Sequence, residues 1–145
     1  MRMRWSGLLI FLCAFFGYLA AQNLLYWPDP TWRAPESVAA KPNPLADNLR
    51  AAAGGKKLFM RNCAECHGKD GTGVPKKHSA DLQLPVVQEE TDGALFWKIT
   101  NGNTGRGMPS FSKLPDLERW QLVLFVRSLR PVVKQDSLSK APPGS

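Results

Sequence analysis

The stretch that decides this sequence is Cys63-Ala64-Glu65-Cys66-His67. Two cysteines separated by two residues and followed directly by a histidine are typical of covalent attachment of a c-type haem. Both thiols would bond to the haem vinyl groups, and the adjacent imidazole would be the proximal ligand of the iron. The motif therefore predicts one haem c, attached through Cys63 and Cys66, with His67 on the iron.

Two other kinds of site also begin with closely spaced cysteines. A closed zinc site usually has four ligands, and after this motif only His78 is available, at a spacing typical of no common zinc finger. A thioredoxin-like dithiol would need a preceding strand and a βαβ pattern, whereas the sequence around this motif indicates helices. Haem attachment is therefore the favoured interpretation.

A second ligand candidate follows in the segment Gly105-Arg106-Gly107-Met108-Pro109-Ser110-Phe111. The thioether of a methionine opposite a histidine stabilises ferrous iron and raises the reduction potential. A lone methionine usually fills a gap in a core, but the surrounding glycines and proline favour a ligand loop here. We expect Met108 to be the sixth ligand, with His78 as the alternative.

The order of several sequence blocks resembles the class I monohaem cytochromes c over residues 48–130. The blocks are CHGKDGTGVP, DGALFWKITNG, GMPSF and ERWQLVLFVRSL, preceded by Gly55 and Phe59 at the family's spacing. The resemblance implies an all-α cytochrome c fold, in which three main helices and long loops surround one haem, and in which Gly55 and Phe59 meet the C-terminal helix. One departure from the family is a short stretch between Gly73 and Asp92.

Three further roles are expected around the haem. In proteins similar to this one, a proline carbonyl accepts the N–H of the proximal histidine, which implies that role for Pro75. Trp97 and Trp120 are candidates to donate indole N–H bonds to the haem propionates, with ordinary aromatic packing as the alternative for each.

Local signals independently predict three helices. Asp47 or Asn48 is placed to cap the first helix, which should extend to about Cys63. Thr91 or Asp92 is placed to cap the second, which should stop at Asn101-Gly102. The third should begin at Pro115 and end before Pro131. Its expected buried residues are Leu117, Trp120, Leu124 and Phe125.

The N-terminal residues 1–26 combine Arg2 and Arg4 with a charge-free apolar run, which predicts a membrane anchor or a cleaved signal peptide. Residues 5–27 are long enough to span a bilayer of about 30 Å, so an uncleaved anchor is favoured. The positive residues predict that the haem domain lies on the periplasmic or extracytoplasmic side. A cleaved segment would instead give a soluble periplasmic protein.

Proline is frequent in residues 27–47, and this segment has no clear periodicity, which predicts an extended linker. Its aromatic residues between Tyr26 and Trp32 also suit docking on a partner subunit. Residues 131–145 are expected to be a disordered tail. The predicted organisation is thus an anchor, a linker, a haem domain over 48–130 and a tail.

The formal net charge of +7 raises the question of a charged partner. Nucleic acid is not favoured, because haem propionates would lower this charge. Basic residues flank the loops expected at the haem edge, where they would attract an acidic redox partner. These residues are Lys76, Lys77, Arg106 and Lys113.

The sequence as a whole predicts an electron carrier and not an enzyme. It contains no paired carboxylates, phosphate loop or second haem motif that would indicate hydrolysis, phosphoryl transfer or two-haem chemistry. One alternative is an electron-entry subunit of a dehydrogenase or respiratory complex. Another is a haem catalyst or gas sensor, in which Met108 would leave the iron or never bind it.

Overall fold

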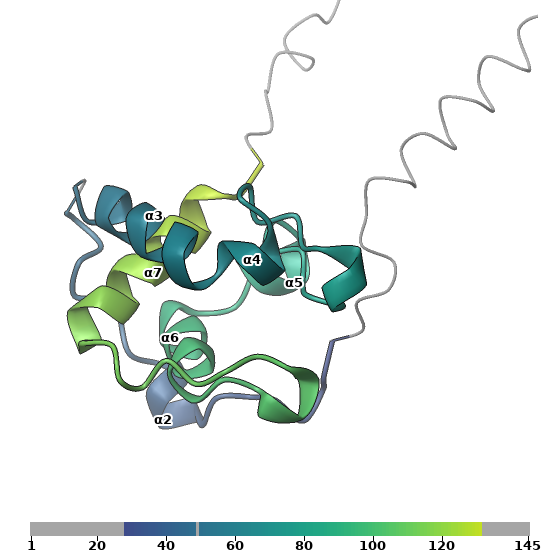
Figure 1. Cartoon of the computed structure of the whole chain (residues 1–145). Coiled ribbons are helices and arrows are strands. Elements are labelled where there is room, and N and C mark those ends of the chain that lie inside the picture. Colours follow the sequence, from purple (N-terminus) through teal and green to yellow (C-terminus); the bar gives the residue numbers. More distant parts are fainter. Residues whose placement is uncertain (1–27, 49, 132–145) are drawn as a thin grey trace, which may run out of the picture.

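The computed structural model describes residues 28–48 and 50–131, and these residues fold without a β-strand. Figure 1 shows the helices in chain order. The α-helices are α2 (Glu36–Ala39), α3 (Ala51–Asn62), α4 (Ala64–His67), α5 (Pro85–Gln88), α6 (Asp92–Asn101) and α7 (Asp116–Ser128), and the 3₁₀ turns are η1 (Pro75–Lys77) and η2 (Thr104–Arg106). The predicted all-α fold class is confirmed.

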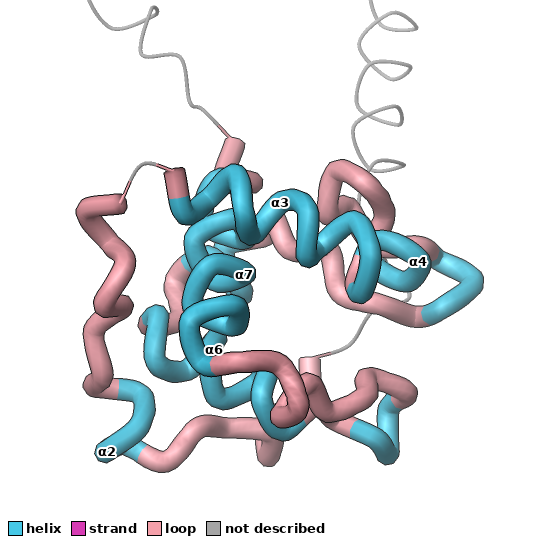
Figure 2. Tube along the Cα trace, turned by 60° about the vertical axis from the view of Figure 1, so that its left-hand side comes forward, coloured by secondary structure: helices cyan, strands magenta, loops and turns pink. Residues whose placement is uncertain are grey.

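The crossing of α3 and α7 is the main packing contact of the fold (Figure 2). At Gly55 the helices are so close that a Cβ atom would lie 1.9 Å from the carbonyl oxygen of Gln121. One turn later, the rings of Phe59 and Phe125 pack with their centroids 4.9 Å apart. The expected meeting of Gly55 and Phe59 with the C-terminal helix is therefore confirmed.

Helix α7 supplies two hydrophobic clusters, one with α3 and one with α6. The first contains Leu58, Phe59, Leu122 and Phe125, and the second contains Leu95, Trp120, Val123 and Val126. Leu117 was expected in the buried face of α7 but is 58% exposed, so that prediction is wrong. Leu117 lies in the first turn of the helix, ahead of the residues that contact α3 and α6.

Local hydrogen bonds account for the helix ends. The Asn48 side chain accepts the N–H of Arg50 at 3.1 Å just before α3. Thr91 Oγ1 accepts the N–H of Ala94 at 3.2 Å, which caps α6 as predicted. Helix α6 stops at Gly102, whose φ of +66° lies in the left-handed region that favours glycine.

The proline-rich segment before α3 differs from the extended linker that the sequence predicts, because its described part packs on the domain. Helix α2 packs against α6, where a Cβ on Gly93 would lie 2.1 Å from the carbonyl oxygen of Val38. Asn43, which is 6% exposed, donates its side-chain N–H to the carbonyl of Trp120 at 3.1 Å. Individual side chains thus anchor a segment that has no regular hydrophobic period.

The predicted anchor in residues 1–26 and the tail in residues 132–145 lie outside the described residues. Within the described ranges, no helix has the length and apolar character needed to cross a membrane. The bounds that divide the chain into anchor, linker, haem domain and tail stay a prediction, and only the extended form expected of the linker is corrected.

Candidate haem site

A cavity of about 320 Å³ lies between α3 and α4 on one side and the loop around Met108 on the other. This volume is in the range of small-molecule and cofactor sites. Figure 1 shows α4 above this region and the green loop around residue 108 below it. Apolar side chains from α3, α6 and α7 line the cavity, including Phe59, Leu95, Ile99, Leu122 and Val126.

The two thiols of the haem motif lie together on the side of the cavity formed by α3 and α4, here called the upper wall. Helix α3 ends at Asn62 and α4 begins at Ala64, so the short turn between them places Cys63 and Cys66 on the cavity. Both are free thiols. Burial, and secondarily the neighbouring Cys66, raises the pKa of Cys63 to about 12, which keeps this thiol neutral.

His67 completes the upper wall and also lines the cavity. Its Nδ1 lies 3.1 Å from the carbonyl oxygen of Ala80. Because a carbonyl only accepts, Nδ1 carries the hydrogen and Nε2 keeps its lone pair. Burial lowers the pKa of His67, and the Ala80 bond opposes that shift only in part. The imidazole is therefore neutral, as an iron ligand must be.

The carbonyl that orients His67 differs from the expected one. The expected carbonyl was that of Pro75, but Pro75 begins the η1 turn, and the returning chain at Ala80 reaches the ring. The N–H of Leu82 donates to Gly71 at 2.7 Å and holds this return in place. Because every residue type has a backbone carbonyl, the sequence alone does not indicate which residue accepts the hydrogen bond from His67.

Met108 lines the opposite side of the cavity. Its backbone forms an isolated antiparallel bridge with Asn103, with N–H to carbonyl distances of 3.0 and 2.9 Å. The turn depends on Gly102, because a Cβ there would lie 2.5 Å from the Pro109 backbone. The structure thus brings Cys63, Cys66, His67 and Met108 around one cavity.

The two tryptophans proposed for the propionates are not among the residues that line this cavity. Trp120 is buried in the second hydrophobic cluster and stacks on Phe96 at 4.1 Å between ring centroids. Trp97 is half-buried on α6. Trp32, which the sequence analysis considered only for partner docking, does line the cavity.

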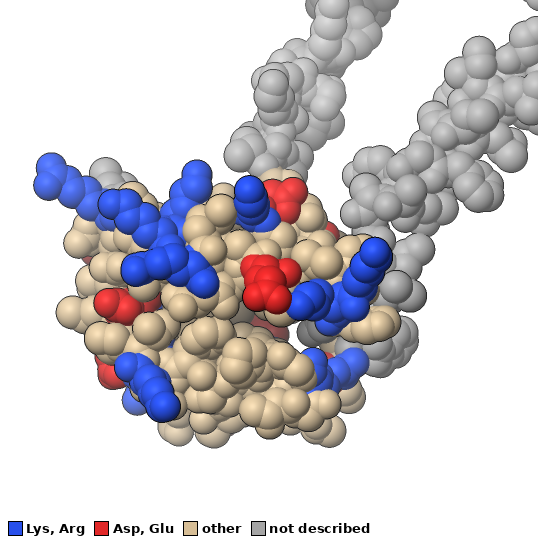
Figure 3. All heavy atoms as spheres, in the orientation of Figure 1, with Lys and Arg blue, Asp and Glu red and all other residues tan. Residues whose placement is uncertain are grey.

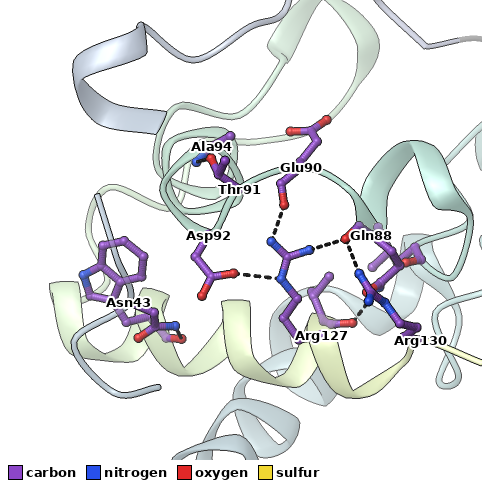
Figure 4. A network of polar contacts seen from close by, with 11 residues as sticks. Asn43, Gln88, Glu90, Thr91, Asp92, Ala94, Arg127 and Arg130 are labelled. Atoms are coloured by element: carbon purple, nitrogen blue, oxygen red, sulfur yellow. Dashed lines mark hydrogen bonds and ion pairs between the residues drawn. The ribbon is translucent and has the colours of Figure 1, made fainter. Parts of the chain in front are cut away.

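The short stretch after Gly73 forms part of the cavity wall through Val86 and Val87. Arg127 of α7 fixes the end of this stretch, as Figure 4 shows. Its guanidinium donates to the Asp92 side chain and to the Gln88 carbonyl at 2.8 Å each, and also to the Glu90 carbonyl. Arg130 donates to the same Gln88 carbonyl at 2.6 Å. These bonds attach the wall to α7.

Charges of both signs surround the cavity. Three basic residues line it, Lys77, Lys98 and Arg106, together with three acidic residues, Asp29, Glu65 and Glu90. Lys77 pairs with Glu65 at 2.9 Å, and Lys98 pairs with Glu90. Figure 3 shows acidic and basic groups interspersed on this face of the molecule. The lining therefore has equal numbers of basic and acidic side chains. Lys76 and Lys113 are exposed and do not belong to the lining.

The residues present fit haem c. Two free thiols and a neutral imidazole occupy one wall, a thioether lies on the other, and apolar side chains fill the space around them. Among the described residues, no three or more His, Cys, Asp or Glu side chains are grouped so as to hold a metal ion by themselves. The fold and the site define a c-type cytochrome domain.

Comparison with known proteins defines the family. Residues 50–126, more than half of the chain, match the family described as cytochrome c oxidase, cbb3-type, subunit III. The chain belongs to this family. The predictions of a covalently bound haem c and of electron transfer are thereby confirmed.

Two curated relatives are similar over the same domain. The cbb3-type cytochrome c oxidase subunit FixP of Rhizobium etli is 31% identical over 80 residues, which cover 54% of this chain and 28% of the relative. Subunit CcoP of Rhodobacter capsulatus is 32% identical over 71 residues, which cover 49% and 24%. The similarity thus spans about a quarter of each relative. No solved structure matches the chain.

Proposed function

We propose that this domain passes single electrons, that His67 and Met108 would ligate its haem iron, and that Cys63 and Cys66 would be the attachment points. The observation that carries the proposal is the placement of these four side chains on facing walls of one cavity. When bound, haem c supplies an iron that cycles between the ferric and ferrous states.

The surrounding residues suit electron transfer without ligand exchange. The Ala80 carbonyl holds the His67 ring, and the bridge to Asn103 holds the Met108 backbone. The apolar walls would exclude water from the site and, with a methionine ligand, would favour ferrous iron. Residues held in this way would move little when a bound iron changed its oxidation state.

The optical spectrum of the haem-loaded protein tests this proposal. A methionine-to-ferric charge-transfer band should be present and should vanish in Met108→Ala. Met60→Ala is the matched control, because Met60 is 39% exposed and outside the cavity lining, and this variant should keep the band. The ferrous protein should not bind carbon monoxide. A missing band together with rapid carbon monoxide binding would favour a haem catalyst or gas sensor.

A place in a larger redox complex is the second candidate. Both relatives are named as subunits of a cbb3-type cytochrome c oxidase, and we infer a corresponding role here as an electron-transferring subunit. We further propose that residues 5–27 anchor the chain and place the haem domain on the periplasmic side. Purification of the full chain from membranes under mild detergent should retain an oxidase, whereas a free carrier would elute alone.

We also infer that the redox partner presents an acidic surface to the basic residues near the cavity mouth. Lys76 and Lys113 are exposed, and the pairing of Lys77 with Glu65 reduces its contribution. Electron transfer to an acidic redox protein should slow as salt increases, and the double variant Lys76→Glu, Lys113→Glu should weaken this dependence. Equal rates at low and high salt would exclude an acidic partner.

A further inference from the structure

The residues before the family-matched region include a segment that contacts the methionine loop. Residues 28–33, here called the N-terminal strap, lie outside the match over 50–126. Three of them, Pro28, Asp29 and Trp32, line the cavity. We propose that the strap positions the methionine loop, and that Asp29 and Trp32 are positioning residues that keep Met108 on the iron.

The first tether joins Asp29 to Asn103. The Asn103 side chain donates to Asp29 Oδ2 at 3.1 Å, while the backbone of Asn103 forms both hydrogen bonds of the bridge to Met108. Thr31 holds the carboxylate in turn, because its backbone N–H and its hydroxyl donate to Asp29 Oδ1 at 2.9 and 2.7 Å. The strap thus contacts the residue that is paired directly with the ligand.

The second tether joins Trp32 to the neighbouring residue of the same loop. The indole Nε1 donates to the Gly102 carbonyl at 2.9 Å. Gly102 is the residue at which α6 ends and the chain turns toward Met108. Lys98 of α6 lies over the Trp32 ring at 4.7 Å from its centroid, which favours this ring position through a cation–π contact.

The strap itself is attached to the domain beyond the two tethers. The chain continues from residue 33 into α2, which packs against α6 at Val38 and Gly93. The start of the methionine loop therefore has a support outside the family-matched region, because the strap contacts both Gly102 and Asn103. Helix α2 in turn attaches the strap to α6. Without the strap, the bridge to Asn103 would keep its own two hydrogen bonds but lose this outside support.

The experiment uses the full haem-loaded chain and rests on the proposed Met108 ligation. Asp29→Ala removes one tether, and Trp32→Phe keeps an aromatic ring but removes the indole donor. The expected result is that exogenous imidazole displaces methionine from ferric iron about threefold to tenfold more readily for each variant, since each loses one hydrogen bond to the methionine loop. Asp29→Asn, which keeps an acceptor oxygen, should restore most of the wild-type resistance.

Matched controls separate positioning from general stability. Asp47→Ala removes an exposed carboxylate from the same N-terminal segment, and Trp97→Phe changes a tryptophan that does not line the cavity. Both should keep wild-type imidazole affinity. In the strap variants, the melting temperature of the helices should stay close to that of the wild type, while the affinity for imidazole rises.

A double-mutant cycle tests the first tether from its other end. Asn103→Ala should weaken methionine ligation, and adding Asp29→Ala should then have little further effect, because the shared bond is already absent. Additive effects, or wild-type imidazole affinity in Trp32→Phe and Asp29→Ala, would overturn the strap proposal. A wild-type protein that lacks the methionine band would instead overturn the proposed function, so the two failures are distinguishable.

Discussion

The two walls of the haem cavity are built differently. The wall that carries Cys63, Cys66 and His67 continues directly from the α3·α7 crossing, where Phe59 and Leu122 are each 1% exposed. The wall that carries Met108 is a loop with a glycine turn, one backbone bridge and two hydrogen bonds shared with the N-terminal strap, one donated by Trp32 and one accepted by Asp29. One wall is fixed by core packing and the other by a few polar contacts.

This difference indicates how substitutions in each wall should affect His67 and Met108. Packing at the helix crossing is dense and shared among many residues, so a change there affects the whole domain. The methionine loop depends on separate hydrogen bonds that are worth about 1 kcal/mol each. We therefore expect that Met108 can be released while the helices and the His67 side remain folded.

Gly55→Ala should have the largest effect, because it acts on the helix crossing. The new Cβ would lie 1.9 Å from the Gln121 carbonyl oxygen, so the two helices must separate. We expect the free energy of unfolding to fall by about 3 kcal/mol, measured by denaturant titration of the haem-loaded protein.

Gly54→Ala is the matched control on the same helix. Its Cβ would meet only the end of the Gln121 side chain, at 2.5 Å, and that end can move away. Alanine also has the higher helix propensity, so the stability of this variant should be unchanged or slightly raised. Equal destabilisation by Gly54→Ala and Gly55→Ala would contradict the close crossing.

Gly102→Ala should break the methionine wall and leave the helices folded. The position has a φ of +66°, and a Cβ would lie 2.5 Å from the Pro109 backbone. The methionine charge-transfer band should be lost or greatly weakened, with helical circular dichroism retained. Gly107→Ala has a similar φ of +85° but open space around the Cβ, so it should cost about 1 kcal/mol of strain and keep the band.

Arg127→Met should have an intermediate effect on the wall formed by residues 85–90. It removes the donors to Gln88, Glu90 and Asp92 while keeping an unbranched side chain of similar reach. We expect a loss of about 2 kcal/mol and faster hydrogen exchange of residues 86–92. Arg130→Met, which loses one bond to Gln88, should show a smaller change in both quantities.

The pH dependence of the first tether should be the smallest effect. Hydrogen bonds from the Thr31 side chain and backbone, and then from Asn103, lower the pKa of Asp29 from 3.8 to about 2, with a further contribution from Arg106. A lowered pKa means that the hydrogen bonds to the Asp29 carboxylate, those from Thr31 first and that from Asn103 next, stabilise the fold above pH 3.8, and that this effect is lost as the pH falls toward 2. The melting temperatures of wild type and Asp29→Ala should differ at pH 7 and converge near pH 2, and a constant difference would contradict the tether.

The helices and the candidate ligands could be read from the sequence because their signals are local. The Cys63 to His67 motif, the Thr91 cap and the stop at Gly102 each depend on residue types within a few positions. The meeting of Gly55 with α7 followed from the resemblance to a family, since residue spacing alone does not specify which helices cross.

The features that the sequence did not reveal depend on contacts between distant segments. The Ala80 carbonyl is a backbone group, and nothing in the type of residue 80 marks it as a partner of His67. The segment over residues 27–47 was predicted to be an extended linker because it contains many prolines, yet Trp32 and Asn43 dock on residues 70 or more positions away. Trp97 and Trp120 each have an indole N–H that could donate to a propionate, and only the packed structure shows that they do not line the cavity.

The most direct test of unequal walls is a guanidinium titration of the ferric haem-loaded protein with two probes. The methionine charge-transfer band reports the loop wall, and far-ultraviolet circular dichroism reports the helices. We predict that the band disappears at a clearly lower denaturant concentration than the one at which the helices unfold. Coincident transitions would contradict it, because they would show that Met108 is held by the same cooperative packing as the α3·α7 core.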